Sequence, residues 1–194
     1  MSVVGSSEKQ RFAQHRESQM NQYRFCPMCG KELGMSPTEA QWVVACHGCG
    51  FRASPKPAVG VGVIVLEGEL IIMGRRGSRG GPRYKGAWCI PCGYLEWGED
   101  VRDAARREFL EETGLEVDIR GVYAVHSNFH NPKSLTVGIW FSGDVVGGSM
   151  QAGDDLDSVG YFPLGAIPEP LAFPTDRLVL EQLRGEILRP PLRV

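Results

Sequence analysis

The sequence predicts an α+β protein in which a small cysteine-rich module precedes the main domain. Two C-x2-C pairs lie near the N-terminus, at Cys26/Cys29 and Cys46/Cys49. Apolar runs with strand character begin at residue 59 and recur as far as residue 164. Helix signals are concentrated in two segments, about 100–113 and 175–188. Strands and helices therefore share one chain, with a separate metal-binding pattern ahead of them.

Length and charge narrow the possible classes of protein. A chain of 194 residues suits one ordinary domain plus a small appendage. The formal net charge of −2 gives no general attraction to nucleic acid or membranes. No apolar run approaches the roughly 20 residues of a membrane span, and Gly5-Ser-Ser-Glu-Lys9 interrupts any signal core. We expect a cytoplasmic protein with no membrane partner, and leave open whether it is a homodimer.

Residues 1–22 are polar and have no sustained apolar stripe. This composition is typical of a frayed helix or a disordered segment. We assign no function to this segment.

The second segment, residues 23–54, has the spacing of a structural zinc site. Sixteen residues separate the two cysteine pairs, and a glycine follows each pair at Gly30 and Gly50. Four thiolates complete a tetrahedron around Zn²⁺, which predicts a zinc ribbon ligated by Cys26, Cys29, Cys46 and Cys49. His47, inside the second pair, is then a non-ligand. The alternative is four unligated thiols. Between the pairs, residues 41–45 form a predicted strand.

Residues 54–57 form a short, stiff linker to the main domain. Residues 59–66 and 70–73 flank Glu67-Gly-Glu69, which is typical of a hairpin. A glycine-rich loop follows at residues 74–86 and carries five cations: Arg75, Arg76, Arg79, Arg83 and Lys85. Arg75 and Arg76 leave the strand end and are the candidate substrate-binding residues, through phosphate. The alternative is a solvated loop.

The helix expected at about residues 100–113 has clear end signals. Asp100 is a favourable N-cap, and Asp103 stands where a capping box places an acid. Gly114 occupies the position of a C′ glycine. Glu108, Glu111 and Glu112 then project from one side of about one turn, and Arg107 can contact Glu111 at i,i+4.

Three neighbouring carboxylates repel one another, and the simple explanation is a solvated acidic helix face. The alternative is a site for a hard divalent cation, because Mg²⁺ prefers oxygen ligands and often recruits substrate phosphates as well. Such a cation neutralises phosphate charge and generates an attacking hydroxide.

The stretch from Gly93 to Leu115 resembles the Nudix box, G-x5-E-x7-R-E-U-x-E-E-x-G-U, where U is aliphatic or aromatic. Every specified position matches: Gly93, Glu99, Arg107, Glu108, Phe109, Glu111, Glu112, Gly114 and Leu115. The resemblance covers about residues 57–188, the expected second domain. It implies the Nudix fold, with a mixed sheet between helices, and hydrolysis of a nucleoside diphosphate linked to another group.

The resemblance also implies the site residues. Glu108, Glu111 and Glu112 would bind Mg²⁺ or Mn²⁺, and Gly93 would add its carbonyl oxygen. One glutamate would activate water, and Arg107 completes the catalytic candidates. An intact box argues against a regulatory module that binds nucleotide without turnover.

Two other features lie near the box. Cys89 and Cys92 form a third C-x2-C, which could be a redox pair or a metal site. The segment resembles the Trp-x-x-Pro-x-Gly strand that precedes the Nudix box, so we expect buried thiols without chemistry. Downstream, many Nudix proteins carry an acidic residue before a W/Y-F-P-L strand. Asp155 matches that place as a further metal ligand, with Asp154 and Asp157 nearby.

The remaining chain predicts strands at 116–126, 134–146 and 159–164, and a packed helix at 175–188. His126 and His130 lie near the connection between the first two strands and are weak candidates for a substrate-facing loop. Tyr94, Trp97 and Phe129 are candidates for stacking on a base or flavin, with packing as the alternative.

A zinc ribbon ahead of a Nudix domain resembles the NADH pyrophosphatase arrangement. That subfamily carries an S-Q-P-W-x-F-P-x-S array downstream of its box, and the nearest string in residues 116–194, Leu171–Asp176, has only its Phe173-Pro174 pair. The ending at residues 167–173 instead resembles Nudix members that hydrolyse ADP-ribose or FAD. The expected substrate is therefore ADP-ribose or FAD, giving AMP and the other phosphate. NADH or NAD hydrolysis is the alternative.

Overall fold

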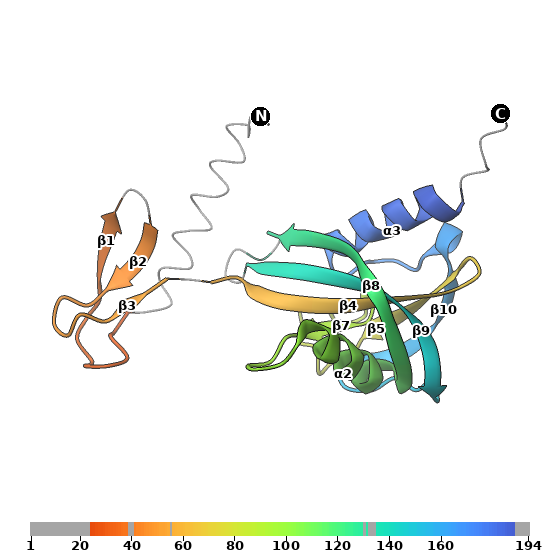
Figure 1. The fold of residues 1–194 in the computed structure, drawn as a ribbon, viewed down its shortest axis with the longest axis horizontal. Coiled ribbons are helices and arrows are strands. Elements are labelled where there is room, and N and C mark those ends of the chain that lie inside the picture. The colour runs from red at the N-terminus through yellow and green to blue at the C-terminus, as the bar shows by residue number, and fades with distance from the viewer. Residues whose placement is uncertain (1–23, 39–40, 55, 130, 132–134, 189–194) are drawn as a thin grey trace. The chain divides into compact units, whose positions relative to one another are not determined.

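A computed structural model describes residues 24–38, 41–54, 56–129, 131, 135–188. The expectations for residues 1–22 and for His130 lie outside this range. The chain divides into two compact units, Met1–Pro57 with Asn131–Leu135, and Ala58–His130 with Thr136–Val194. Figure 1 shows the elements of each unit.

The first unit contains a three-stranded antiparallel sheet in the order β1-β2-β3, with strands Gly34–Thr38, Gln41–Ala45 and Arg52–Ala53. The sequence predicted β2 but not β1, because Gly34-Met-Ser-Pro-Thr38 has little strand character. Among the residues of this unit whose burial is described, 24–33, 43–54, 56, 57, 131 and 135, the buried apolar ones are Cys26, Val44 and Cys46. So small an interior needs another source of stability.

The second unit is built on a seven-stranded mixed sheet. Its main path is β10-β5-β4-β9-β8, with β6 paired to β5 and β7 paired to β4. The bounds are β4 Ala58–Glu67, β5 Leu70–Arg76, β6 Trp88–Cys89, β7 Cys92–Tyr94, β8 Leu115–Asn128, β9 Thr136–Gly148 and β10 Leu156–Pro163. The β4–β9 pair is parallel and the others are antiparallel.

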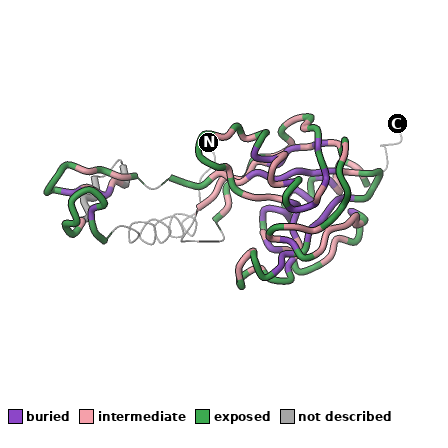
Figure 2. The backbone as a smooth tube through the Cα atoms, turned by 90° about the horizontal axis from the view of Figure 1, so that it is seen from below, coloured by how far each residue is buried: buried purple, intermediate pink, exposed green. Residues whose placement is uncertain are grey.

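Two helices cover opposite faces of this sheet, α2 (Val101–Thr113) and α3 (Pro174–Ile187) (Figure 1). Successive side chains of a strand point to opposite faces. On β4, Val61, Val63 and Val65 therefore pack with Phe109 of α2. Ile64 packs on the other face, with α3 residues Val179, Leu180 and Leu183. Figure 2 shows the buried residues gathered in the interior of this unit, with exposed residues around them. The expected sheet between helices is confirmed.

The caps of α2 follow the sequence closely. The side chain of Asp100 accepts a hydrogen bond from the Arg102 amide, and Gly114 ends the helix in a left-handed conformation. Asp103 does not complete a capping box. Its carboxylate accepts instead from Arg106, at 2.9 Å. The predicted start and end of α2 are confirmed.

Most strand ends differ from expectation by one to three residues, and three differences have a structural cause or consequence. β5 extends through Arg75 and Arg76, because both residues pair with β10. The segment before the box is two short strands, β6 and β7, separated by Ile90 and Pro91. A proline lacks the amide hydrogen that a continuous ladder needs. Finally, β10 ends at Pro163, and residues 164–166 form a 3₁₀ turn, η1.

Candidate functional site

The four N-terminal cysteines form a compact sulfur cluster. Their sulfur atoms all lie within 4.8 Å of one another. The Cys26–Cys49 and Cys29–Cys46 pairs are 3.5 and 3.6 Å apart. A tetrahedral Zn²⁺ with ligands at about 2.3 Å requires sulfur separations of about 3.8 Å. The donor set therefore fits a tetrahedral metal site.

The two halves of the cluster are built alike. In each half, the amide of the first cysteine donates to the residue five positions later, Cys26 to Lys31 and Cys46 to Phe51. The glycine after each pair has positive φ, 70° at Gly30 and 77° at Gly50, which suits a residue without Cβ. Each pair of thiols is thus presented by a preformed knuckle.

In the second unit, Arg107 links three of the box glutamates. Its guanidinium donates two hydrogen bonds of 2.9 Å to Glu99. Nη1 also donates to Glu108 at 2.9 Å and to Glu111 at 3.2 Å. The predicted Arg107–Glu111 contact is confirmed. These bonds lower the pKa of Glu99 and raise that of Arg107.

One cationic nitrogen therefore sits between the carboxylates of Glu108 and Glu111, at a position where a cation is stabilised by both. Glu111 is exposed, whereas Glu108 is half-buried, and burial raises the pKa of Glu108. The chemistry of this donor set fits a hard cation, which prefers carboxylate oxygens.

Glu112 has a different environment from its neighbour. It is 1% exposed. One carboxylate oxygen accepts from the Cys92 amide at 2.7 Å, and the other lies 3.8 Å from Nη1 of Arg76. Burial raises the pKa of Glu112 to about 8. The structure thus gathers Glu108 and Glu111 around Arg107 and directs Glu112 toward Arg76.

Gly93 lies against the Glu108 carboxylate. A Cβ at residue 93 would come within 1.9 Å of Oε2 of Glu108. Any side chain there would displace Glu108. The first glycine of the box is therefore explained by close packing, in addition to the role expected for its carbonyl oxygen.

Three aspartates at the start of β10 have different partners: Asp154 and Asp155 precede the strand, and Asp157 is its second residue. Asp155 accepts from Arg76 at 2.5 Å, and Asp157 accepts from Arg75 at 2.7 Å. Asp154 has φ of 46°, and its negative charge contributes to the raised pKa of Glu108. The carboxylate of Asp155, our predicted metal ligand, is thus engaged by Arg76, while Asp154 is the aspartate whose charge acts on Glu108.

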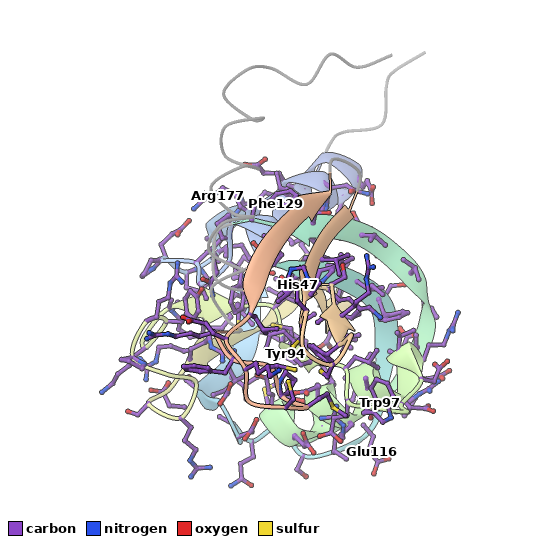
Figure 3. The ribbon with its side chains drawn as sticks, turned by 90° about the vertical axis from the view of Figure 1, so that its left-hand side faces the viewer. His47, Tyr94, Trp97, Glu116, Phe129 and Arg177 are labelled. Carbon is purple, nitrogen blue, oxygen red and sulfur yellow. The ribbon has the colours of Figure 1, made fainter. Side chains whose placement is uncertain are left out.

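The other sequence candidates come from several elements of the second unit. Tyr94, the last residue of β7, and Trp97, in the loop before α2, are exposed (Figure 3). Phe129 follows β8 and is also exposed. His126 packs edge-on against Trp140, with ring centroids 5.6 Å apart.

Sequence reasoning assigned no role to two residues at the site. Cys92 contributes its amide to Glu112, and Glu99 holds Arg107. A backbone amide leaves no residue-type signal, so its role could be found only in three dimensions. Cys89 is buried, as expected, and Cys92 is half-buried.

Comparison with known proteins identifies the family. The NUDIX domain pattern matches residues 56–183, which is more than half of the chain. The chain belongs to the NUDIX family. The matched range contains α2, both helix-covered faces of the sheet and every box residue.

Two curated relatives of this NUDIX protein differ in coverage. It is 32% identical over 136 residues to the ADP-ribose pyrophosphatase of Methanocaldococcus jannaschii, covering 69% of this chain and 78% of that one. It is 30% identical over 149 residues to the NAD-capped RNA hydrolase NudC of Pseudomonas aeruginosa. This match covers 75% of this chain and 49% of that NudC. This chain therefore spans about half the length of that NudC.

Solved structures show the same fold. A NUDIX hydrolase from Nitrosomonas europaea superposes with a TM-score of 0.73 at 28% identity, covering 84% of this chain and 92% of that one. Within the residues that the structure describes, no helix is long and apolar enough to cross a membrane.

Proposed function

We propose that this NUDIX protein hydrolyses the pyrophosphate bond of a nucleoside diphosphate derivative, with ADP-ribose or FAD preferred over NADH. The products would be AMP and the other phosphate. The observation that carries the reaction class is the complete box, with Glu99, Glu108 and Glu111 bonded to Arg107 on α2. The proposed catalytic unit is residues 57–188, with a separate zinc ribbon at residues 23–54.

Glu108, Glu111 and Glu112 are the proposed holders of Mg²⁺ or Mn²⁺, together with the carbonyl of Gly93. Such a cation neutralises phosphate charge and lowers the pKa of a bound water. Asp154 is an additional acidic candidate beside Asp155, because its charge acts on Glu108.

Apart from binding the cation, the main contribution of the side chains is to orient the groups at the site. Arg107 holds Glu99 and the carbonyl of Tyr94 against α2, at 2.9 and 3.1 Å, and so fixes the loop that precedes the helix. Glu111, with a side chain 47% exposed, is the box carboxylate most accessible to substrate and water. We therefore favour Glu111 as the residue that takes the proton from attacking water, which requires access to that water.

Substrate choice rests on two supports. When the Phe-Pro pair of the NADH pyrophosphatase array is placed on Phe173-Pro174, its S-Q-P-W part falls on residues 168–171, where only the proline, Pro170, is kept. In addition, the match to the archaeal ADP-ribose pyrophosphatase covers more of that relative than the match to NudC does, 78% against 49%. The second candidate function is hydrolysis of NADH or NAD-capped RNA, which the similarity to NudC supports.

The test is kcat/KM for ADP-ribose, FAD and NADH, each with Mg²⁺ and with Mn²⁺, and with products identified. We expect ADP-ribose or FAD to lead. A tenfold preference for NADH would overturn the substrate assignment. An NAD-capped RNA oligonucleotide added to the panel separates NudC-type activity from hydrolysis of the free dinucleotide.

The same assay tests the carboxylates. Glu111→Gln keeps the side-chain shape and removes a charge, so turnover should fall by about 100-fold or more. The melting temperature without metal should stay unchanged, because Glu111 is exposed. Glu116→Gln is the matched control, since Glu116 is also exposed but lies on β8 (Figure 3). Near-normal turnover by Glu111→Gln would remove Glu111 from the mechanism.

A further inference from the structure

Among the five cations of residues 74–86, Arg76 is the one whose side chain lies in the interior. It is 7% exposed. The ring centroid of Phe173 lies 5.6 Å from its guanidinium carbon. On the loop side, a Cβ at Gly80 would lie only 2.7 Å from Nη2 of Arg76. The guanidinium is therefore enclosed, and a phosphate group could reach it only after these neighbours moved.

The charge of Arg76 is directed at two carboxylates from different elements. Nη2 donates to Asp155, in the loop before β10, at 2.5 Å. Nη1 lies 3.8 Å from the buried carboxylate of Glu112 on α2. The other Glu112 oxygen accepts from the Cys92 amide. Arg76 on β5 thus joins α2, β7 and the loop before β10 around one buried charge.

Backbone contacts strengthen this junction. The Arg76 amide donates to Ala87 at 2.8 Å, and its carbonyl accepts from Gly86 at 2.7 Å. The next amide, Gly77, donates to the carbonyl of Asp155 at 2.8 Å. The part of the glycine-rich loop that follows Arg76 therefore returns at Gly86 and Ala87 to bond with the Arg76 backbone. Its first residue, Gly77, is bonded to the segment that contains Asp154 and Asp155.

We propose that Arg76 is a positioning residue that holds Glu112 and the Asp154–Asp155 segment in place for catalysis, and is not a substrate phosphate ligand. This rests on the proposed function. Glu112 and Asp155 would otherwise be two acidic groups sharing one partly buried region without a counter-charge, and removing one partner of a buried pair is strongly unfavourable.

The neighbouring Arg75 shows why this role belongs to Arg76. Adjacent residues of a strand point to opposite faces. The Arg75 side chain is 44% exposed and pairs with Asp157, itself 45% exposed. Arg75 therefore remains available to solvent and ligands, whereas Arg76 is committed to the interior.

The proposal is tested by measuring kcat and KM of three variants, Arg76→Met, Arg76→Lys and Asp155→Asn. The substrate is ADP-ribose or whichever substrate the wild-type protein turns over. A positioning role predicts that Arg76→Met lowers kcat about tenfold or more while KM changes less than about twofold. Arg76→Lys should recover part of kcat, since it restores the charge. The double variant Arg76→Met/Asp155→Asn should lose less activity than the product of the two single losses, because the two side chains share one contact.

An effect of Arg76→Met on KM, with little effect on kcat, would overturn the proposal. A phosphate ligand predicts a large rise in KM with kcat nearly unchanged. Full activity of Arg76→Met would equally contradict a positioning role. If Arg76→Met does not fold, Arg76→Lys and Asp155→Asn still test the same contact.

Amide hydrogen exchange gives a readout that needs no activity. Loss of the Arg76 contacts should speed exchange at the Cys92 and Gly77 amides, which are bonded to Glu112 and Asp155. Arg120→Met is the matched control, because Arg120 also pairs with an aspartate, Asp144, but on the exposed surface. Unchanged exchange at both amides would contradict the proposal even in an active enzyme. An inactive wild-type protein with faster exchange in Arg76→Met would instead count against the proposed function alone.

Discussion

Glu111 and Glu112 are adjacent in the sequence, but the fold gives them opposite environments. The Glu111 side chain is 47% exposed and that of Glu112 is 1% exposed. Successive residues of a helix are about 100° apart around its axis, so one faces solvent while the next faces the sheet. Residue type alone therefore does not separate an accessible carboxylate from one held in the interior.

Asp176 is a second buried carboxyl group, in the first turn of α3. It is 1% exposed and accepts from the Ile90 amide at 3.1 Å. Burial raises its pKa to about 7 from an ordinary 3.8. The folded protein thus binds a proton that the unfolded chain releases at lower pH, so stability is lost as pH rises from about 4 to about 7.

Asp176→Asn should reduce this pH dependence. Asparagine retains an oxygen that can accept from Ile90 but cannot ionise. At pH 8 the variant should be more stable than wild type, by up to about 4 kcal/mol for a shift of this size. Chemical denaturation of both proteins at pH 5 and pH 8, without divalent metal, measures the difference. Parallel stability curves at the two pH values would show that Asp176 keeps an ordinary pKa.

At the scale of elements, α2 carries the proposed chemistry and is defined by local signals. Asp100 caps its first turn, and Phe109 anchors the opposite side of the helix in the core. Arg107 then binds the preceding loop through Glu99 and the Tyr94 carbonyl. The helix is therefore fixed at its start, along its buried face and against the loop that contains Trp97.

Removing the N-cap should weaken α2 without touching the carboxylates. Asp100→Ala leaves the Arg102 amide without its side-chain acceptor, which costs about 1 kcal/mol at a typical N-cap. Thermal unfolding should show a decrease of about 2–4 °C. Asp103→Ala is the control, because Asp103 forms only an exposed pair with Arg106 and should change the melting temperature much less. Equal effects of the two variants would argue against capping by Asp100.

At the scale of the whole molecule, two units have separate means of stabilisation. The NUDIX unit has a buried core on each face of its sheet. The first unit has few buried apolar residues among those described, and its four cysteines supply the missing cross-link if metal is bound. Binding of a structural metal is then part of the folding free energy of that unit.

Purified protein should contain about one tightly bound Zn²⁺ per chain, the number that one four-cysteine site holds. Cys46→Ser should lose this metal and make residues 24–54 sensitive to protease, while the NUDIX unit keeps its own melting transition. Elemental analysis, limited proteolysis and calorimetry report these effects. Cys89→Ser is the control, because Cys89 lies outside the sulfur cluster. Freshly purified wild-type protein without zinc would contradict the assignment.

Local sequence signals were enough to predict the four-cysteine cluster, the limits of α2 and the spacing of its glutamates. These features depend on caps, helical periodicity and residue chemistry, which act over a few neighbours. The sequence also predicted the mixed sheet between helices, through the family resemblance.

The directions in which the charged side chains point depend on packing between distant segments. Arg75 and Arg76 are equivalent cations in the sequence, yet strand alternation exposes one and buries the other beside Glu112 and Asp155. The partners of Arg76 lie 36 and 79 residues further along the chain, so no local pattern could pair them. The Cys92 amide likewise meets Glu112 only because β7 packs next to α2. Such contacts depend on long-range packing, which residue types and spacings do not specify.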